Sequence, residues 1–131
     1  MVNPKKKGAR GEREAGEWLR DNLDLSYKPQ RILDQVREGG HDLGLGEREG
    51  EPIIAVEVKR RESLSLNEWW YQVICAVDGT ALMPVVMYRK NAQAWSFLVS
   101  AQEIGLERGF VLLDEKVFVQ WYKMKVFVTD R

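Results

Sequence analysis

The sequence predicts a mixed α/β fold in which helices flank one central mixed β-sheet. Two observations carry this prediction: apolar residues recur at helical spacing in two segments, and short runs rich in apolar and β-branched residues lie between polar turns. Helices are expected at residues 8–23 and 66–77, and strands at residues 41–45, 53–59, 84–88 and 94–99. Helices that alternate with short strands are typical of a layered fold built on one sheet.

The first helix, residues 8–23, is indicated by the spacing of Leu19 and Leu23, with charged residues on the opposite side. The chain that follows, residues 25–32, is expected to be extended, with an interruption at Pro29. This helix therefore presents one apolar stripe to the sheet and a charged side to the solvent.

The strand at residues 53–59 is the clearest in the chain, because it is rich in β-branched residues. A glycine-containing turn at residues 37–40 precedes the strand at 41–45, and a polar loop at residues 47–52 separates the two strands. A short polar loop between two strands predicts an antiparallel hairpin.

The second helix is expected to begin at the capping box Ser65-Leu-Asn-Glu68 and to end at Gly79. The last two strands are joined by a turn at residues 89–92, and a short helical piece follows Ser100. Residues 100–131 form a C-terminal extension whose apolar segments the sequence leaves unassigned.

The composition indicates one globular domain, residues 1–131, because 44% of the residues are hydrophobic and 31% are charged. Cys75 is the single cysteine, which excludes an internal disulfide framework and suits a reducing cytoplasm; within an apolar helix it is expected to be a packed core thiol. The longest apolar run, residues 81–88, contains Pro84 and is too short to span a bilayer. We therefore expect a cytoplasmic protein with no membrane partner.

The net charge is zero, but the basic residues are unevenly distributed. They gather near the N-terminus and directly after the 53–59 strand, a pattern typical of nucleic-acid contact. The expected phosphate contacts are Lys5, Lys6, Lys7, Arg10, Arg13, Arg60 and Arg61. A net charge of zero does not exclude a nuclease, because a nuclease also needs negatively charged carboxylates to bind its metal.

Strand alternation places Glu57 and Lys59 on one face of the 53–59 strand, and Ile54, Val56 and Val58 on the other. The second set is a core face, whereas the first ends in a carboxylate and an ammonium group. An ordinary salt bridge at a strand end is the alternative, since a Glu-x-Lys pair also arises by chance.

Asp42 follows two glycines and precedes Leu43, at the junction of a turn and a strand. If the hairpin forms as expected, Asp42 lies beside Glu57, and two close carboxylates repel unless a cation lies between them. Oxygen ligands with few protein contacts suit Mg²⁺. The alternative is a turn aspartate whose side chain bonds its own backbone.

Glu12 is the third candidate carboxylate, because helix geometry places it on the apolar stripe. It precedes Leu19 and Leu23 by whole numbers of turns to within about 20°. Glu14 and Glu17 are expected to point away, toward solvent. A carboxylate on a core face needs a partner, which a metal site would supply; the alternative is a glutamate favoured by the helix dipole at a fraying first turn.

Two further features limit the choice of chemistry. His41 is the only histidine, which argues against zinc and histidine-triad enzymes and makes His41 a neighbour of the site. The segment Trp69–Val77 is apolar on nearly all sides apart from Gln72, so it is expected to pack against a second subunit as well as against its own sheet.

These motifs resemble those of the archaeal-type Holliday junction resolvases (Hjc) of the PD-(D/E)xK nuclease superfamily. The segment from Lys7 to Glu14 is similar to the K-G-x-x-x-E-R-E start of that family, and His41-Asp42-Leu43 stands where the family has x-D-L. Residues 54–59 resemble its I-E-V-K strand, and residues 84–99 resemble its paired later strands. The resemblance covers roughly residues 5–99.

The sequence departs from the superfamily pattern at two places. His41 stands where the superfamily often has proline, and the segment between Glu12 and Asp42 is longer than in archaeal members. Arg31 and Arg37 therefore both qualify as the family's strand-end arginine. A compact enzyme of this kind could equally be cellular or viral.

The resemblance implies a restriction-endonuclease-like core and a homodimer that cuts four-way DNA junctions. Asp42, Glu57 and the carbonyl of Val58 would hold Mg²⁺, for which Mn²⁺ is expected to substitute, and Lys59 would position the attacking water. Glu12 would orient a water on the ion or help to hold a second ion. The alternatives are another PD-(D/E)xK nuclease, of the restriction or repair type, and a DNA-binding module without catalysis.

Overall fold

The computed structural model describes residues 4–32 and 42–128 of the chain. The elements are α1 (Pro4–Asn22), β1 (Asp42–Leu45), β2 (Ile54–Arg60), α2 (Leu66–Val77), β3 (Met83–Arg89), β4 (Ser96–Ser100), the 3₁₀ helix η2 (Ala101–Ile104), β5 (Phe110–Leu113) and α3 (Glu115–Val128). No helix within these residues combines the length and the apolar character needed to cross a bilayer. The predicted turn at residues 37–40, and His41 and Arg37, lie outside the described residues.

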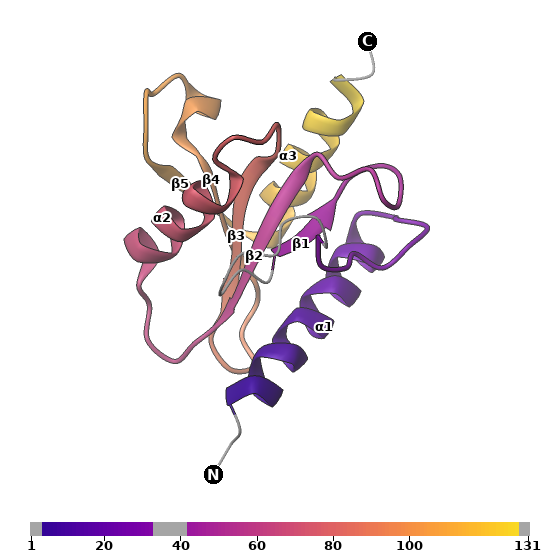
Figure 1. The fold of residues 1–131 in the computed structure, drawn as a ribbon, viewed down its shortest axis with the longest axis vertical. Helices are drawn as coiled ribbons and strands as arrows, with labels where there is room; N and C mark the ends of the chain where they lie inside the picture. The colour runs from indigo at the N-terminus through magenta and orange to yellow at the C-terminus, as the bar shows by residue number, and fades with distance from the viewer. Residues whose placement is uncertain (1–3, 33–41, 129–131) are drawn as a thin grey trace.

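The sheet has the order β1-β2-β3-β4-β5, with β2 and β3 parallel and the other neighbours antiparallel. Parallel neighbours need a crossover connection, and α2 supplies it between β2 and β3. Figure 1 shows α2 on one side of the sheet and α1 and α3 on the other. The predicted α/β fold, with one mixed sheet flanked by helices, is therefore confirmed.

Strand alternation divides the apolar residues between two cores. Val56, Met87 and Phe97 face the layer of α1 and α3, where Leu19 and Phe118 are fully buried. The neighbouring strand residues turn to the other face and pack under α2, in a smaller cluster of Trp69, Trp70, Val73, Val86, Tyr88 and Leu98. The face on which Glu57 lies is that of this second cluster, because Glu57 is the register partner of Val86.

The C-terminal tail is part of the sheet and of the main core. β5 pairs with β4 as the last strand, and α3 packs Phe118, Trp121 and Tyr122 into the core with α1. The predicted helical piece after Ser100 is confirmed as η2, which begins with the Ser100 hydroxyl accepting a hydrogen bond from the Gln102 backbone N–H.

Two local expectations need correction. The helix at α2 begins where expected, but the Ser65 side chain makes no capping hydrogen bond, because its backbone has φ −133° and ψ 61° rather than an ordinary cap conformation. Cys75 is exposed rather than packed in the core, since α2 buries only one side. The segment at residues 25–32, which was expected to be extended, contacts the sheet through an isolated bridge from Arg31 to Leu43.

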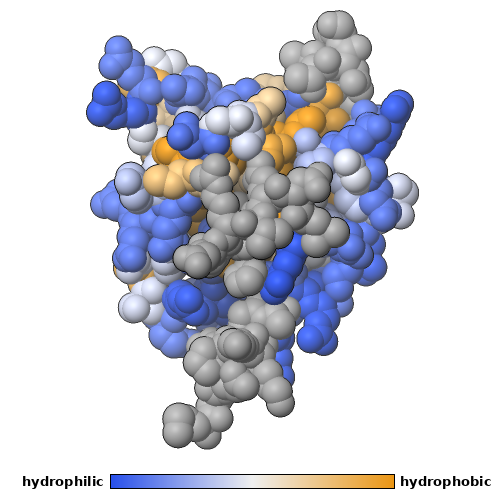
Figure 2. All heavy atoms as spheres, viewed as in Figure 1, coloured by the Kyte–Doolittle hydropathy of each residue, from blue (hydrophilic) through white to orange (hydrophobic). Residues whose placement is uncertain are grey.

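The face of the molecule seen in Figure 2 carries both hydrophilic and apolar residues. Figure 2 shows polar residues over both flanks of the viewed face and exposed apolar residues gathered in its upper part. Several large hydrophobic residues on other elements are also exposed, among them Tyr71 and Ile74 on the outer side of α2. Exposed apolar side chains on one helix face indicate an interaction surface.

Candidate active site

The centre of the site is Glu57 on β2, a charged residue that is only 5% exposed. It forms an ion pair with Lys59, two residues along the same strand, with Lys59 Nζ 3.4 Å from Glu57 Oε1. Burying a carboxylate without a partner is costly, so the ammonium group offsets much of this cost. The predicted same-face placement of Glu57 and Lys59 is confirmed in the geometry.

Asp42 stands directly opposite Glu57 in the sheet. β1 and β2 pair antiparallel with Asp42 in register with Glu57 and Leu45 in register with Ile54. Residues opposite one another in an antiparallel pair are neighbours on one face. The hairpin inferred from the polar loop at residues 47–52 therefore has the register that the sequence predicted.

The hairpin depends on close backbone packing. Gly44 lies between Ile32 and Pro52, where an added Cβ would come within 3.1 Å of both side chains. The backbone N–H of Gly44 donates to the carbonyl of Gln30 over 2.8 Å, which holds the preceding segment along the outer edge of β1. At Leu43 and Gly44, β1 thus lies between β2 on one side and this segment on the other.

Glu12 of α1 is joined to this edge through Arg31. Arg31 Nε lies 2.9 Å from Glu12 Oε2, and Arg31 Nη2 lies 3.3 Å from Glu12 Oε1, so the guanidinium binds the carboxylate through two atoms. The Arg31 backbone bridges Leu43, the residue after Asp42. The expected burial of Glu12 is confirmed, because its side chain is 14% exposed.

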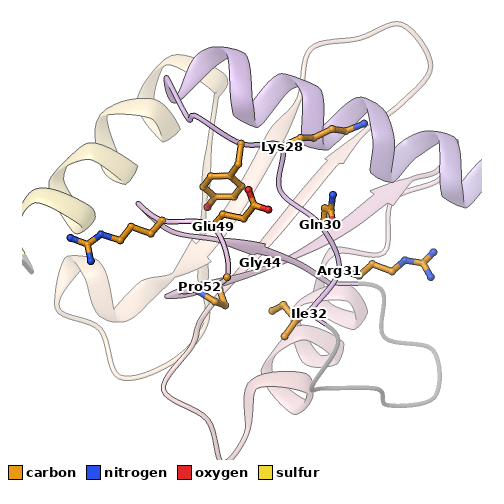
Figure 3. Close-up of a pocket in the computed structure, with 10 residues that line it drawn as sticks. Lys28, Gln30, Arg31, Ile32, Gly44, Glu49 and Pro52 are labelled. Atoms are coloured by element: carbon orange, nitrogen blue, oxygen red, sulfur yellow. The ribbon is translucent and has the colours of Figure 1, made fainter.

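Two adjoining hollows lie along residues 27–32. One, of about 330 Å³, is shown in Figure 3; its walls include Tyr27, Gln30, Gly44, Glu49 and Pro52. The other, of about 320 Å³, is lined by Glu12, Arg13, Lys28, Pro29, Gln30, Arg31 and Leu43. Glu57 and Lys59 line neither hollow, so these two hollows lie beside the Glu12–Arg31 pair rather than over the buried carboxylate.

The residues around Glu57 offer a small number of oxygen donors, which is the donor type that hard divalent metals take. Among the described residues, no group of three or more His, Cys, Asp or Glu side chains is gathered that could hold a metal. The available donors are the buried carboxylate of Glu57, the carbonyl of Val58 and the register partner Asp42. Oxygen donors in small number suit Mg²⁺, which keeps several of its waters.

The predicted DNA-contacting cations fall into two groups. Lys5, Lys6 and Lys7 lie in the first turns of α1, which extend beyond the sheet in Figure 1, and Arg10, Arg13 and Arg61 are exposed. Arg60 differs, because its side chain is only 18% exposed and its guanidinium donates to Glu14 and Asn91.

The expectation that Glu14 points to solvent is wrong. Its carboxylate binds both Arg60 and Arg89, and its side chain is 30% exposed. The helical spacing predicts only which side of α1 is apolar. It does not predict Arg60 and Arg89, the cations that bind Glu14 from the ends of β2 and β3. The sequence does contain a signal for these cations, because an arginine ends each of two strand-like runs. In the sheet these two arginines, Arg60 and Arg89, are register partners. Glu17, by contrast, is 49% exposed, as expected.

A mixed sheet with an aspartate in register with a buried Glu-x-Lys pair defines the class of PD-(D/E)xK nucleases, and the chain matches that class by sequence. It belongs to the family described as phage putative PDDEXK endonucleases, whose model matches residues 3–127. This family agrees with the viral alternative that the sequence left open.

Comparison with solved structures gives a further similarity. The chain is similar to the structure of Hjc from Archaeoglobus fulgidus, described as a Holliday junction resolvase from an archaeal hyperthermophile, with 25% sequence identity and a TM-score of 0.46. The similarity covers 86% of this chain and 87% of the other. A search of curated protein sequences finds no significant match.

Proposed function

We propose that this endonuclease is metal-dependent and resolves four-way DNA junctions by paired, symmetric cuts in the phosphodiester backbone. The observation that carries the catalytic part is the register of Asp42 with the buried Glu57, beside the Lys59 ammonium group. The choice of a junction as substrate is supported by the motifs of residues 7–14, 41–43 and 54–59, which resemble those of junction resolvases.

In this proposal, Asp42, Glu57 and the Val58 carbonyl hold Mg²⁺, or Mn²⁺ in its place. When bound, the ion would lower the pKa of a water and offset negative charge on the scissile phosphate. Lys59 orients the attacking water and stabilises the charge that develops as its proton leaves, since its ammonium group is already fixed 3.4 Å from Glu57. Glu12, held by Arg31, orients a second water or helps to hold a second ion.

Basic residues of α1 and of the segment after β2 would position the DNA. Lys5, Lys6, Lys7, Arg10, Arg13 and Arg61 are proposed to contact phosphates, which fixes the DNA without reading its sequence. Five of them belong to the N-terminal half of α1, and Arg61 directly follows β2. Binding is therefore expected to weaken steeply with added salt.

The decisive experiment compares substrates. The protein is incubated with a synthetic four-way junction, a plain duplex and a flap, with Mg²⁺ or with a chelator. Paired symmetric nicks in the junction alone, lost in the chelator, are the expected result. Fixed-sequence cutting of the duplex would instead identify a restriction-type or repair-type nuclease of the same superfamily, and binding without any cutting would identify a non-catalytic module.

A charge-only substitution tests the assignment of the site. Glu57→Gln keeps the shape of the side chain and removes its charge, so cleavage is expected to fall by about 10³-fold or more while junction binding persists. Mg²⁺ should raise the melting temperature of the wild type and not that of Glu57→Gln. The matched control is Glu107→Gln, because Glu107 is an exposed residue remote in sequence from the site; if Glu57→Gln cuts as the control does, the assignment fails.

A further inference from the structure

A cluster of charged side chains on the α1 side of the sheet joins three elements. Glu14 of α1 accepts a hydrogen bond from Arg60 at the end of β2, with Nη1 3.2 Å from Oε1, and another from Arg89 at the end of β3. Arg60 and Arg89 are register partners on parallel strands, so the carboxylate lies against two adjacent guanidinium groups. The Arg60 side chain is 18% exposed and that of Arg89 is 21% exposed.

Both guanidinium groups are also held from another direction. Arg60 Nη2 donates to Asn91 Oδ1 over 3.0 Å, and the guanidinium carbon of Arg89 lies 4.3 Å from the centre of the Trp95 ring. In the described part of the chain, the Nε atoms of Arg60 and Arg89 are buried without a hydrogen-bond partner. The positions of both arginines therefore depend on Glu14, the shared anion between two partly buried cations.

This cluster fixes α1 against the strand that carries the site. Arg60 directly follows Lys59 on β2, and Glu14 comes two residues after Glu12 on α1. The two backbones also approach closely, because a Cβ added at Gly11 would lie 3.5 Å from the Cβ of Arg60. Since a helix and a strand each move as rigid units over such short spans, a shift between Glu14 and Arg60 would move Glu12 relative to Lys59.

We propose that Glu14 is a positioning residue, which clamps Arg60 and Arg89 so that α1 presents Glu12 at a fixed place beside β1 and β2. The proposal rests on the function proposed above. It also assigns Arg60 a role inside the protein, and leaves Arg61 as the phosphate contact after β2. Misplacing a group at a reaction centre by about 1 Å lowers a rate by about 10²-fold, so a remote clamp has a measurable effect.

The test compares Glu14→Gln with Glu17→Gln, a control on the same helix whose carboxylate is exposed and lies 3.7 Å from Lys28. Single-turnover cleavage at saturating DNA is expected to fall by about 10-fold to 100-fold in Glu14→Gln, with the Kd for DNA changed by less than about threefold. Glu17→Gln should match the wild type in both. A Glu14→Gln protein that folds and cuts within twofold of the wild type would overturn the proposal.

A second variant separates positioning from DNA contact. Arg60→Lys keeps the positive charge but cannot bridge Glu14 and Asn91 as a planar fork does. If Arg60 acts in the clamp, Arg60→Lys cuts more slowly, and Arg60→Gln leaves the salt dependence of DNA binding unchanged. If Arg60 instead contacts a phosphate, Arg60→Gln reduces the salt slope by about one and Arg60→Lys does not, which contradicts the clamp. If Glu14→Gln fails to fold, the cleavage rate of Arg60→Lys still tests the clamp.

A Mg²⁺ titration by calorimetry keeps the clamp testable when no DNA is cut. Glu14→Gln is expected to bind Mg²⁺ at least about fivefold more weakly than the wild type, because α1 would no longer hold Glu12, which is proposed to orient a water or hold an ion, in its place. Equal affinities in Glu14→Gln and Glu17→Gln would contradict the clamp. A wild type that binds Mg²⁺ but cuts none of the three DNA substrates would instead overturn the proposed function alone.

Discussion

Buried polar side chains in this protein differ in whether they have a partner. Glu57 is buried beside the Lys59 ammonium group, and Tyr27 is buried with its hydroxyl bonded to the Gly46 backbone. Among the described residues, the Tyr122 hydroxyl is buried without a hydrogen-bond partner. Burial raises the pKa of Tyr122 to about 12, with smaller contributions from the charges of Tyr27 and Glu47.

The raised pKa of Tyr122 predicts a loss of stability at high pH. The folded protein keeps the phenol proton up to a pKa of about 12, whereas the unfolded chain loses it at the ordinary pKa of 10.0. The folded state therefore binds more protons across this window, and the stabilisation, complete below pH 10, is lost as pH rises toward 12. In Tyr122→Phe the 295 nm absorbance titration should lack its highest-pH step; a step that persists would contradict the assignment.

The same substitution at Tyr27 is the matched control at neutral pH. Tyr27→Phe removes two hydrogen bonds, of 2.5 Å to the Gly46 carbonyl and 3.1 Å from the Gly46 N–H. This loss is expected to lower the free energy of unfolding by about 1–3 kcal/mol, whereas Tyr122→Phe should change it by less than about 0.5 kcal/mol. Urea unfolding at pH 7 measures both values.

At the scale of single residues, the sequence predicted contacts along a strand better than contacts between distant segments. The Glu57–Lys59 face follows from strand alternation alone, and the place of Asp42 beside Glu57 follows from the inferred hairpin, whose register the structure shows. The partners of Glu12 and Glu14 could not be predicted in the same way, because Arg31 and Arg89 reach α1 only after the sheet has formed. Long-range ion pairs leave no local periodicity.

At the scale of elements, the β1–β2 hairpin places Asp42 opposite Glu57, and its turn has little room. A Cβ added at Gly46 would lie 2.6 Å from the backbone carbonyl of Glu51, so a larger residue must push the two strands apart. Gly46→Ala is expected to lower the free energy of unfolding by about 1–3 kcal/mol and to reduce cleavage. Urea unfolding and the junction assay measure the two effects.

The control for this prediction is the same substitution in α1. A Cβ added at Gly11 would make an ordinary contact, 3.5 Å from the Arg60 Cβ, and alanine favours a helix more than glycine does. Gly11→Ala should therefore leave the protein as stable or raise its stability by about 0.5–1 kcal/mol. Equal stabilities for Gly46→Ala and the wild type would show that the hairpin is not limited by space.

The elements themselves were mostly predictable, and the exceptions have physical causes. Periodicity identified α1, α2 and the first four strands to within a few residues. α3 was not identified, although Phe118, Trp121 and Tyr122 form a buried helical stripe. The reason is that Val117 and Met124, on its outer side, are also apolar and 43% and 54% exposed, which obscures the helical period.

At the scale of the whole molecule, the outer side of α2 is the surface at which the sequence predicts a second subunit. α2 buries Trp69, Trp70 and Val73, and leaves Tyr71 69% and Ile74 41% exposed. A hydrogen bond with Cys75 raises the pKa of Tyr71, which places the exposed thiol beside this apolar pair. A junction has two symmetric cleavage points, and a two-fold dimer presents two active sites to them.

We therefore expect the wild type to have twice the mass of one chain in solution, and Tyr71→Glu to be monomeric, because a charge in an apolar interface loses its hydration without gaining a partner. Leu106→Glu is the control, since Leu106 is 55% exposed and follows η2 rather than lying on α2. Light scattering gives the masses, and a maleimide should label Cys75 more slowly in the dimer than in Tyr71→Glu. The monomer should still nick junctions, but with single rather than paired cuts. A wild type that is monomeric, or a Leu106→Glu variant that dissociates while Tyr71→Glu stays paired, would exclude α2 as the dimer surface.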